Sequence, residues 1–275
     1  MESMKARLLT AVIGIPAALG VLILGEHFNW IMNIIVALLC AMMIFELLSA
    51  KKLHNNPFVM VPCAVYALAQ PFLFIFGYEL IALYAFALVM FFILIINSTK
   101  ISFSDVSFSI LGTILISWGM NSILLLPPMY YNRISLFFVL CLGVPWCADA
   151  GAYFTGVFFG KHKLCPRVSP NKTVEGFIGG ILFGTLGSVA IGFVYSFVYT
   201  NAEFNYLVLL LIGVLASVVS VLGDLTFSLI KRYCNIKDYG SIFPGHGGFL
   251  DRFDSVIVSA PLVFFIGLYI PIFII

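Results

Sequence analysis

The sequence predicts an all-α polytopic membrane protein with about nine transmembrane helices. Of its 275 residues, 62% are hydrophobic and only 9% are charged, and the mean hydropathy is +1.12. These values lie far outside the range of soluble globular domains. Backbone groups in lipid must be hydrogen-bonded internally, and long continuous apolar runs favour helices over a closed barrel. We therefore expect one membrane domain over residues 1–275.

A span needs about 20 apolar residues to cross roughly 30 Å of hydrocarbon. The runs that qualify are 8–25, 28–49, 57–76, 80–97, 107–127, 134–158, 174–199, 204–230 and 253–275. Only Gly77, Tyr78 and Glu79 separate the third run from the fourth, so a count of eight or ten stays open. The basic start of the chain also resembles a signal peptide, but no convincing cleavage site follows. We expect the first run to remain as an uncleaved span.

The distribution of Lys and Arg predicts the orientation in the membrane. With nine spans and a cytoplasmic N-terminus, 13 of the 14 Lys and Arg residues fall on the cytoplasmic side, and Arg133 alone falls on the other. Basic residues favour cytoplasmic loops in membrane proteins. One span more or fewer in the middle would destroy this asymmetry. The sequence therefore predicts a cytoplasmic N-terminus and an exterior C-terminus.

Two cytoplasmic loops, 160–173 and 231–251, stand out by length and polarity. Long polar loops on one face are where a water-borne substrate can be handled. We therefore place the catalytic region in residues 134–275 and regard residues 1–130 as scaffold helices. The net charge of +2 is too small to indicate a nucleic-acid partner. The six cysteines have no metal-ligand spacing and predict no disulfide framework.

Charged groups inside spans indicate function, because each costs on the order of 2.5–3.5 kcal/mol at mid-membrane. Glu46, Asp149, Asp224 and Asp254 lie within or at the ends of apolar runs, and Glu175 opens another.

The strongest of these signals is a polar stripe around Asp224. Ser220, Ser228 and Lys231 fall on the same face of its predicted helix, at spacings of four, four and seven residues. The alternative is an intramembrane Asp–Lys pair that only holds helices together.

Asp251 and Asp254 are three residues apart at the start of the last span, so they share one side of its first turn. Two carboxylates there repel each other. A divalent cation would offset this repulsion, and Mg²⁺ favours one or two carboxylates together with substrate phosphates. Ordinary acidic capping of the helix is the alternative.

The loop directly before these aspartates reads Pro244-Gly-His-Gly-Gly248. Its glycines, Gly247 and Gly248 among them, allow backbone N–H groups to approach an anion closely. His246 could donate to a phosphate or act as an acid or base. A cationic cluster suited to phosphates surrounds the loop: Lys231, Arg232, Lys237 and Arg252. A simple tight turn is the alternative.

The 134–199 region adds a second group of candidates. Asp149 and Tyr153 lie one helical turn apart, and Lys172 in the following loop can contact a phosphate. Glu175 follows in the first turn of the next span, where a plain salt bridge is an equal alternative. Glycines at 176, 180 and 184 form a series that is typical of close helix packing.

Residues 228–254 resemble the signature of the phosphatidate cytidylyltransferase family, the CDP-diacylglycerol synthases. The signature positions matched are Ser228, Lys231, Arg232, Lys237, Asp238, Gly240, Pro244, His246, Gly247, Gly248, Asp251, Arg252 and Asp254. The resemblance extends through the Trp146–Asp149 and Ser169–Gly176 segments and through the span count. The first 130 residues resemble the family in topology only.

The resemblance implies a reaction in which CTP and phosphatidic acid give CDP-diacylglycerol and pyrophosphate, with Mg²⁺ required. On this hypothesis Asp224, Asp251 and Asp254 hold the metal centre, with room for a second cation. The expected catalytic residues are Asp224, Asp251, Lys231 and His246. The expected substrate-binding residues are Lys172, Arg232, Lys237, Arg252, Gly247, Gly248, Asp149, Glu175 and Ser228.

The resemblance also implies a homodimer in a lipid bilayer. The compact chain favours a bacterial inner membrane, and the basic loops predict an active site that faces the cytoplasm. Two other functions stay open. One is a CTP-dependent kinase of a lipid alcohol, which would release CDP, and the other is a secondary transporter. Against a transporter, the polar groups gather at one face and no repeat of interrupted spans is visible.

Overall fold

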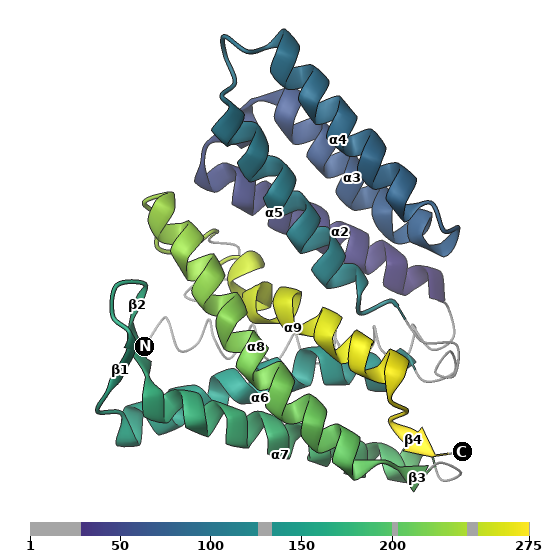
Figure 1. Cartoon of the computed structure of the whole chain (residues 1–275), viewed down its shortest axis with the longest axis vertical. Helices are drawn as coiled ribbons and strands as arrows, with labels where there is room; N and C mark the ends of the chain where they lie inside the picture. Colours follow the sequence, from purple (N-terminus) through teal and green to yellow (C-terminus); the bar gives the residue numbers. More distant parts are fainter. Residues whose placement is uncertain (1–28, 126–133, 200–202, 241–246, 275) are drawn as a thin grey trace, which may run out of the picture. The chain divides into compact units, whose positions relative to one another are not determined.

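The computed structural model describes residues 29–125, 134–199, 203–240 and 247–274. In this part of the chain, eight helices are long and apolar enough to cross a membrane (Figure 1). Each overlaps one of the predicted runs from the second to the ninth, which confirms the all-α polytopic class. The predicted first span, 8–25, lies outside the described residues, so the count of nine stays a prediction.

The elements are α2 (Asn29–Ala50), η1 (Leu53–Asn55), α3 (Pro57–Ile75), α4 (Glu79–Ile96), α5 (Phe103–Asn121), α6 (Ile134–Phe159), β1 (Lys163–Cys165), β2 (Ser169–Thr173), α7 (Val174–Val198), β3 (Glu203–Phe204), α8 (Tyr206–Tyr233), α9 (Leu250–Tyr269) and β4 (Phe273–Ile274). Strands β1 and β2 pair antiparallel, as do β3 and β4. All six cysteines are free, as predicted.

Several helix ends differ from the predicted bounds. Helix α5 begins at Phe103 and not at 107, because Ser102 and Asp105 form a capping box. Helix α8 continues to Tyr233, so Lys231 and Arg232 lie in its last turn. Helix α9 begins at Leu250 and ends at Tyr269, short of the predicted 275.

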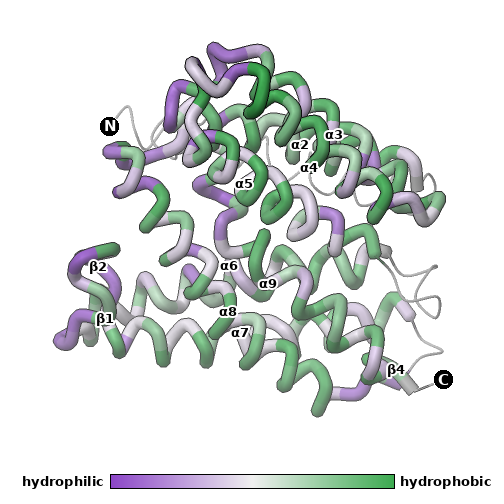
Figure 2. The backbone as a smooth tube through the Cα atoms, turned by 45° about the horizontal axis from the view of Figure 1, so that its top comes forward, coloured by the Kyte–Doolittle hydropathy of each residue, from purple (hydrophilic) through white to green (hydrophobic). Residues whose placement is uncertain are grey.

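The chain divides into two compact units, which are described separately below. The first comprises residues 1–124 and 233–253, and the second comprises residues 125–232 and 254–275. The segment 233–253, expected in the catalytic region, therefore packs with helices that were expected to be scaffold. Figure 2 shows the hydrophilic residues gathered at β1–β2 and at helix ends, whereas the helices are mostly hydrophobic.

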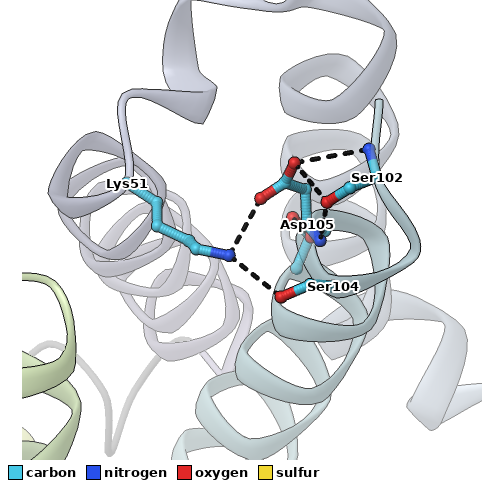
Figure 3. Close-up of polar contacts among 5 residues, drawn as sticks. Lys51, Ser102, Ser104 and Asp105 are labelled. Carbon is cyan, nitrogen blue, oxygen red and sulfur yellow. Dashed lines mark hydrogen bonds and ion pairs between the residues drawn. The ribbon is translucent and has the colours of Figure 1, made fainter. Parts of the chain in front are cut away.

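In the first unit, Lys51 connects the end of α2 to the start of α5 (Figure 3). Its Nζ lies 2.8 Å from Oδ1 of Asp105 and 3.3 Å from Oγ of Ser104. The same ammonium lies over the rings of Phe108 and Tyr233, at 5.2 and 5.5 Å from the centroids. Because Tyr233 ends α8, Lys51 also fixes the point where the 233–253 segment enters this unit.

In the second unit, α6 and α7 pack closely along a stripe of glycines. A Cβ at Gly176 would lie 2.8 Å from the carbonyl oxygen of Ala152, and one at Gly180 would lie 3.0 Å from that of Ala148. These distances leave no room for a side chain. The predicted packing role of the glycine series is therefore confirmed.

Asp105→Asn should destabilise the first unit by about 1–2 kcal/mol, because it removes the charge that faces Lys51 and weakens the cap of α5. The free energy of unfolding in mixed micelles measures this effect. Ser104→Ala is the control, since it removes only a 3.3 Å contact with Lys51. Equal stability of Asp105→Asn and wild type would contradict this role of the pair.

Candidate active site

Three carboxylates from different helices of the second unit approach one another: Asp149 on α6, Asp224 on α8 and Asp254 on α9. Asp254 is buried, with 6% of its surface exposed. It interacts electrostatically with the like charges of Asp224 and Asp149 and with the opposite charge of Lys231. Such a cluster at the edge of a membrane helix bundle needs cations beside it.

Lys172 supplies one of these cations. This residue of β2 forms an ion pair with Oδ2 of Asp224, and both side chains are about a quarter exposed, at 24% and 23%. Ser228 lies one turn further along α8, and its Oγ donates a long hydrogen bond of 3.5 Å to Oδ1 of Asp224. An Asp–Lys pair was the predicted alternative for Asp224, and the structure contains such a pair with Lys172 of the hairpin. Lys231 interacts electrostatically with Asp254.

Ser255 links the other two carboxylates, and sequence reasoning missed it. Its Oγ donates to Oδ2 of Asp149 at 3.0 Å, and its N–H donates to Oδ1 of Asp254 at 2.8 Å. Gly223 allows α8 and α9 to approach here, because a Cβ would lie 2.7 Å from the carbonyl oxygen of Asp254. The signal available in the sequence was a serine directly after an aspartate of the last apolar run.

Glu175 binds the backbone directly before β1, at the base of the β1–β2 hairpin that carries Lys172. Its carboxylate accepts hydrogen bonds from the N–H of Lys161 at 3.1 Å and of His162 at 3.2 Å, and it lies 2.7 Å from His162 Nδ1. Thr173 caps α7 by accepting from the N–H of Gly176 at 3.0 Å. The structure thus contains the salt bridge considered as the alternative for Glu175, and a contact of this residue with substrate stays a prediction.

In the first unit, Asp251 lies in the first turn of α9 and binds the segment that precedes this helix. Its Oδ2 accepts hydrogen bonds from the N–H of Tyr239 at 2.8 Å and of Gly248 at 3.0 Å. Gly247 has a φ of +83°, a conformation that favours glycine, and a Cβ there would lie 2.8 Å from the same oxygen. Both N–H groups precede α9, so these contacts hold the preceding segment, and the metal role of Asp251 stays a prediction.

Glu46 of α2 contacts the same turn, although sequence reasoning gave it no role. Its Oε1 accepts from the N–H of Phe249 at 3.0 Å, and its Oε2 accepts from the N–H of Leu250 at 2.8 Å. A Cβ on Gly240 or Gly248 would overlap this carboxylate. The glycines that suggested a phosphate-binding loop therefore also make room for a protein carboxylate.

The other candidates lie at the polar ends of the helices or beyond the described part of the chain. Arg232, Lys237 and Arg252 are exposed, and their predicted binding of phosphates stays a prediction. His246 lies outside the described residues, so its predicted role is untested. Within the described ranges, no three His, Cys, Asp or Glu side chains are arranged to hold a metal ion by themselves. The predicted metal ligands, Asp224, Asp251 and Asp254, therefore stay a prediction.

Glu175→Gln tests whether Glu175 holds the hairpin or binds substrate. Because Gln cannot accept as strongly from two backbone N–H groups and His162, amide exchange at Lys161 and His162 should accelerate roughly tenfold. Asn171→Ala, at an exposed position of β2, is the matched control. Unchanged exchange together with a raised KM for the substrate would instead assign Glu175 to substrate binding.

Comparison with known proteins agrees with the resemblance in the signature. A model of the cytidylyltransferase family matches residues 5–270. The phosphatidate cytidylyltransferase of Bacillus subtilis strain 168 is 34% identical, over 97% of this chain and 98% of its own length. Proteins of the same name from Staphylococcus haemolyticus and Staphylococcus aureus strain COL are 32% and 33% identical, each over 94% of this chain and 97% of the relative. The chain belongs to the cytidylyltransferase family.

Proposed function

We propose that this protein is a phosphatidate cytidylyltransferase. A phosphate oxygen of phosphatidic acid attacks the α-phosphorus of CTP, the bond from that phosphorus to the bridging oxygen of the β-phosphate breaks, and pyrophosphate leaves. The products are CDP-diacylglycerol and pyrophosphate. The observation that carries the proposal is the cluster of Asp149, Asp224 and Asp254 with Lys172 and Lys231, in a chain whose relatives bear this name.

The residues of the cluster suit a reaction between two polyanions. Such a transfer requires positioning and charge neutralisation more than covalent chemistry from the protein. Lys172 and Lys231 would bind phosphate oxygens, and Arg232, Lys237 and Arg252 would add to this binding. Phosphatidic acid is already ionised near neutral pH, so the attacking oxygen needs no strong general base.

The donor set fits the Mg²⁺ that the family resemblance implies. Asp224 and Asp254 offer carboxylate oxygens, and Asp251 is the third predicted ligand. Mg²⁺ is bound by one or two carboxylates together with phosphates and water, so it does not require three protein ligands at one point. When bound, the ion would neutralise charge on the phosphates and assist the departure of pyrophosphate.

We also propose that the site faces the cytoplasm of a bacterial inner membrane and that the chain spans the membrane nine times, with its N-terminus inside. The bacterial relatives and the 13 basic residues assigned to one side support this orientation. A site at that interface would serve both a water-soluble nucleotide and a lipid headgroup. The homodimer rests on the family resemblance alone.

The position of the transferred label separates this activity from the alternatives. Purified protein in phosphatidic acid micelles should move label from α-labelled CTP into lipid, because the cytidylyl group is transferred. With γ-labelled CTP, it should release labelled pyrophosphate and leave the lipid unlabelled. Omission of phosphatidic acid and addition of a chelator should each abolish the product. Lipid labelled from γ-labelled CTP, with release of CDP, would show a lipid-alcohol kinase and overturn the proposal. Solute uptake without lipid labelling would indicate a transporter.

A further inference from the structure

Glu46 is a buried carboxylate that the proposed reaction does not use. Only 3% of its surface is exposed, and it lies in α2, within a span of the predicted scaffold. Its two oxygens accept hydrogen bonds from Phe249, directly before α9, and from Leu250, the first residue of α9, which are 203 and 204 positions away in the sequence. A buried carboxylate persists only where hydrogen bonds or opposite charge compensate its desolvation.

The surrounding backbone is shaped around this carboxylate. A Cβ on Gly248 would overlap both oxygens of Glu46, and one on Gly240 would overlap Oε1. Two glycines from separate parts of the 233–253 segment therefore leave the space that Glu46 fills. The segment needs glycine at both positions for this contact.

Glu46 and Asp251 together bind four backbone N–H groups of this segment, three of them consecutive. Asp251 accepts from Tyr239 and Gly248, and Glu46 accepts from Phe249 and Leu250. The two carboxylates interact as like charges, and the positive end of the α9 backbone offsets their repulsion. Because Glu46 fixes the N–H groups of Phe249 and Leu250, the two residues directly before Asp251, it limits how the Asp251 side chain can lie.

We propose that Glu46 is a positioning residue of the reaction: by binding the first turn of α9, it holds Asp251 in the orientation that the reaction requires. This inference rests on the proposed function, because Asp251 is one of its predicted metal ligands. A residue that only stabilised the fold would tolerate any isosteric replacement that leaves the protein folded. A positioning residue requires two negatively charged oxygens at this distance.

The test compares Glu46→Gln, Glu46→Asp and Glu46→Ala with wild type. Gln fills the same space but offers one acceptor oxygen to two N–H groups. Asp keeps the charge, but its shorter side chain places the carboxylate one methylene further from these N–H groups. Gln70→Met is the matched control, since Gln70 is a buried polar side chain (1% exposed) of α3 in the same unit. Gel filtration in detergent checks that each variant is folded. If Glu46→Ala does not fold, the comparison uses Glu46→Gln and Glu46→Asp alone.

Two readouts are measured on each variant. Amide exchange at Phe249 and Leu250 should accelerate roughly tenfold in Glu46→Gln, and this readout is independent of activity. Formation of CDP-diacylglycerol should fall about 10- to 100-fold, the Mg²⁺ concentration for half-maximal rate should rise, and Glu46→Asp should recover part of the loss. Gln70→Met should match wild type in both readouts.

A substitution at Gly248 tests the contact between this glycine and the Glu46 carboxylate. Gly248→Ala should slow turnover in the wild-type background and should cost much less in Glu46→Ala, because the carboxylate it would overlap is then absent. If Glu46→Gln keeps wild-type turnover and Mg²⁺ dependence, the positioning role is wrong. If wild type itself forms no CDP-diacylglycerol, the proposed function fails instead, and amide exchange still decides whether Glu46 holds the turn.

Discussion

The structure depends on the rule that a carboxylate in a membrane helix must have a compensating partner. Three described carboxylates follow this rule in different ways. Asp105 pairs with Lys51, Asp224 pairs with Lys172, and Glu46 accepts from the backbone N–H groups that start α9. In each case the partner comes from another helix or from a loop, so compensation of the charge also fixes tertiary structure.

The same rule describes the contacts that polar segments make with the helices. The 160–173 hairpin contributes Lys172 to Asp224 and is closed by Glu175, while the 233–253 segment is held by Lys51 at its start and by Glu46 near its end. The signature residues divide between the two units. Asp224, Lys231 and Asp254 belong to the second, and Lys237, Gly248 and Asp251 belong to the first.

The sequence predicted what depends on composition and local spacing. Eight apolar runs, the close packing of Gly176 and Gly180 and the polar loop before α7 follow from patterns within one segment. It did not predict the contacts that tertiary structure creates. Glu46 meets residues more than 200 positions away, Asp224 forms an ion pair with Lys172 of a hairpin, and Ser255 bridges carboxylates of two helices. The start of α5 depends on a capping box, which hydropathy alone does not report.

We propose that the carboxylates around Asp224 attract cations strongly enough to bind a divalent ion. Binding of Mn²⁺, as a paramagnetic substitute for Mg²⁺, to the purified protein in detergent without substrate tests it most directly. Electron paramagnetic resonance should show saturable binding to wild type and to Glu203→Gln, an exposed carboxylate of the same unit. Asp224→Asn should weaken binding at least about tenfold. Equal Mn²⁺ affinity of Asp224→Asn and wild type would contradict the account.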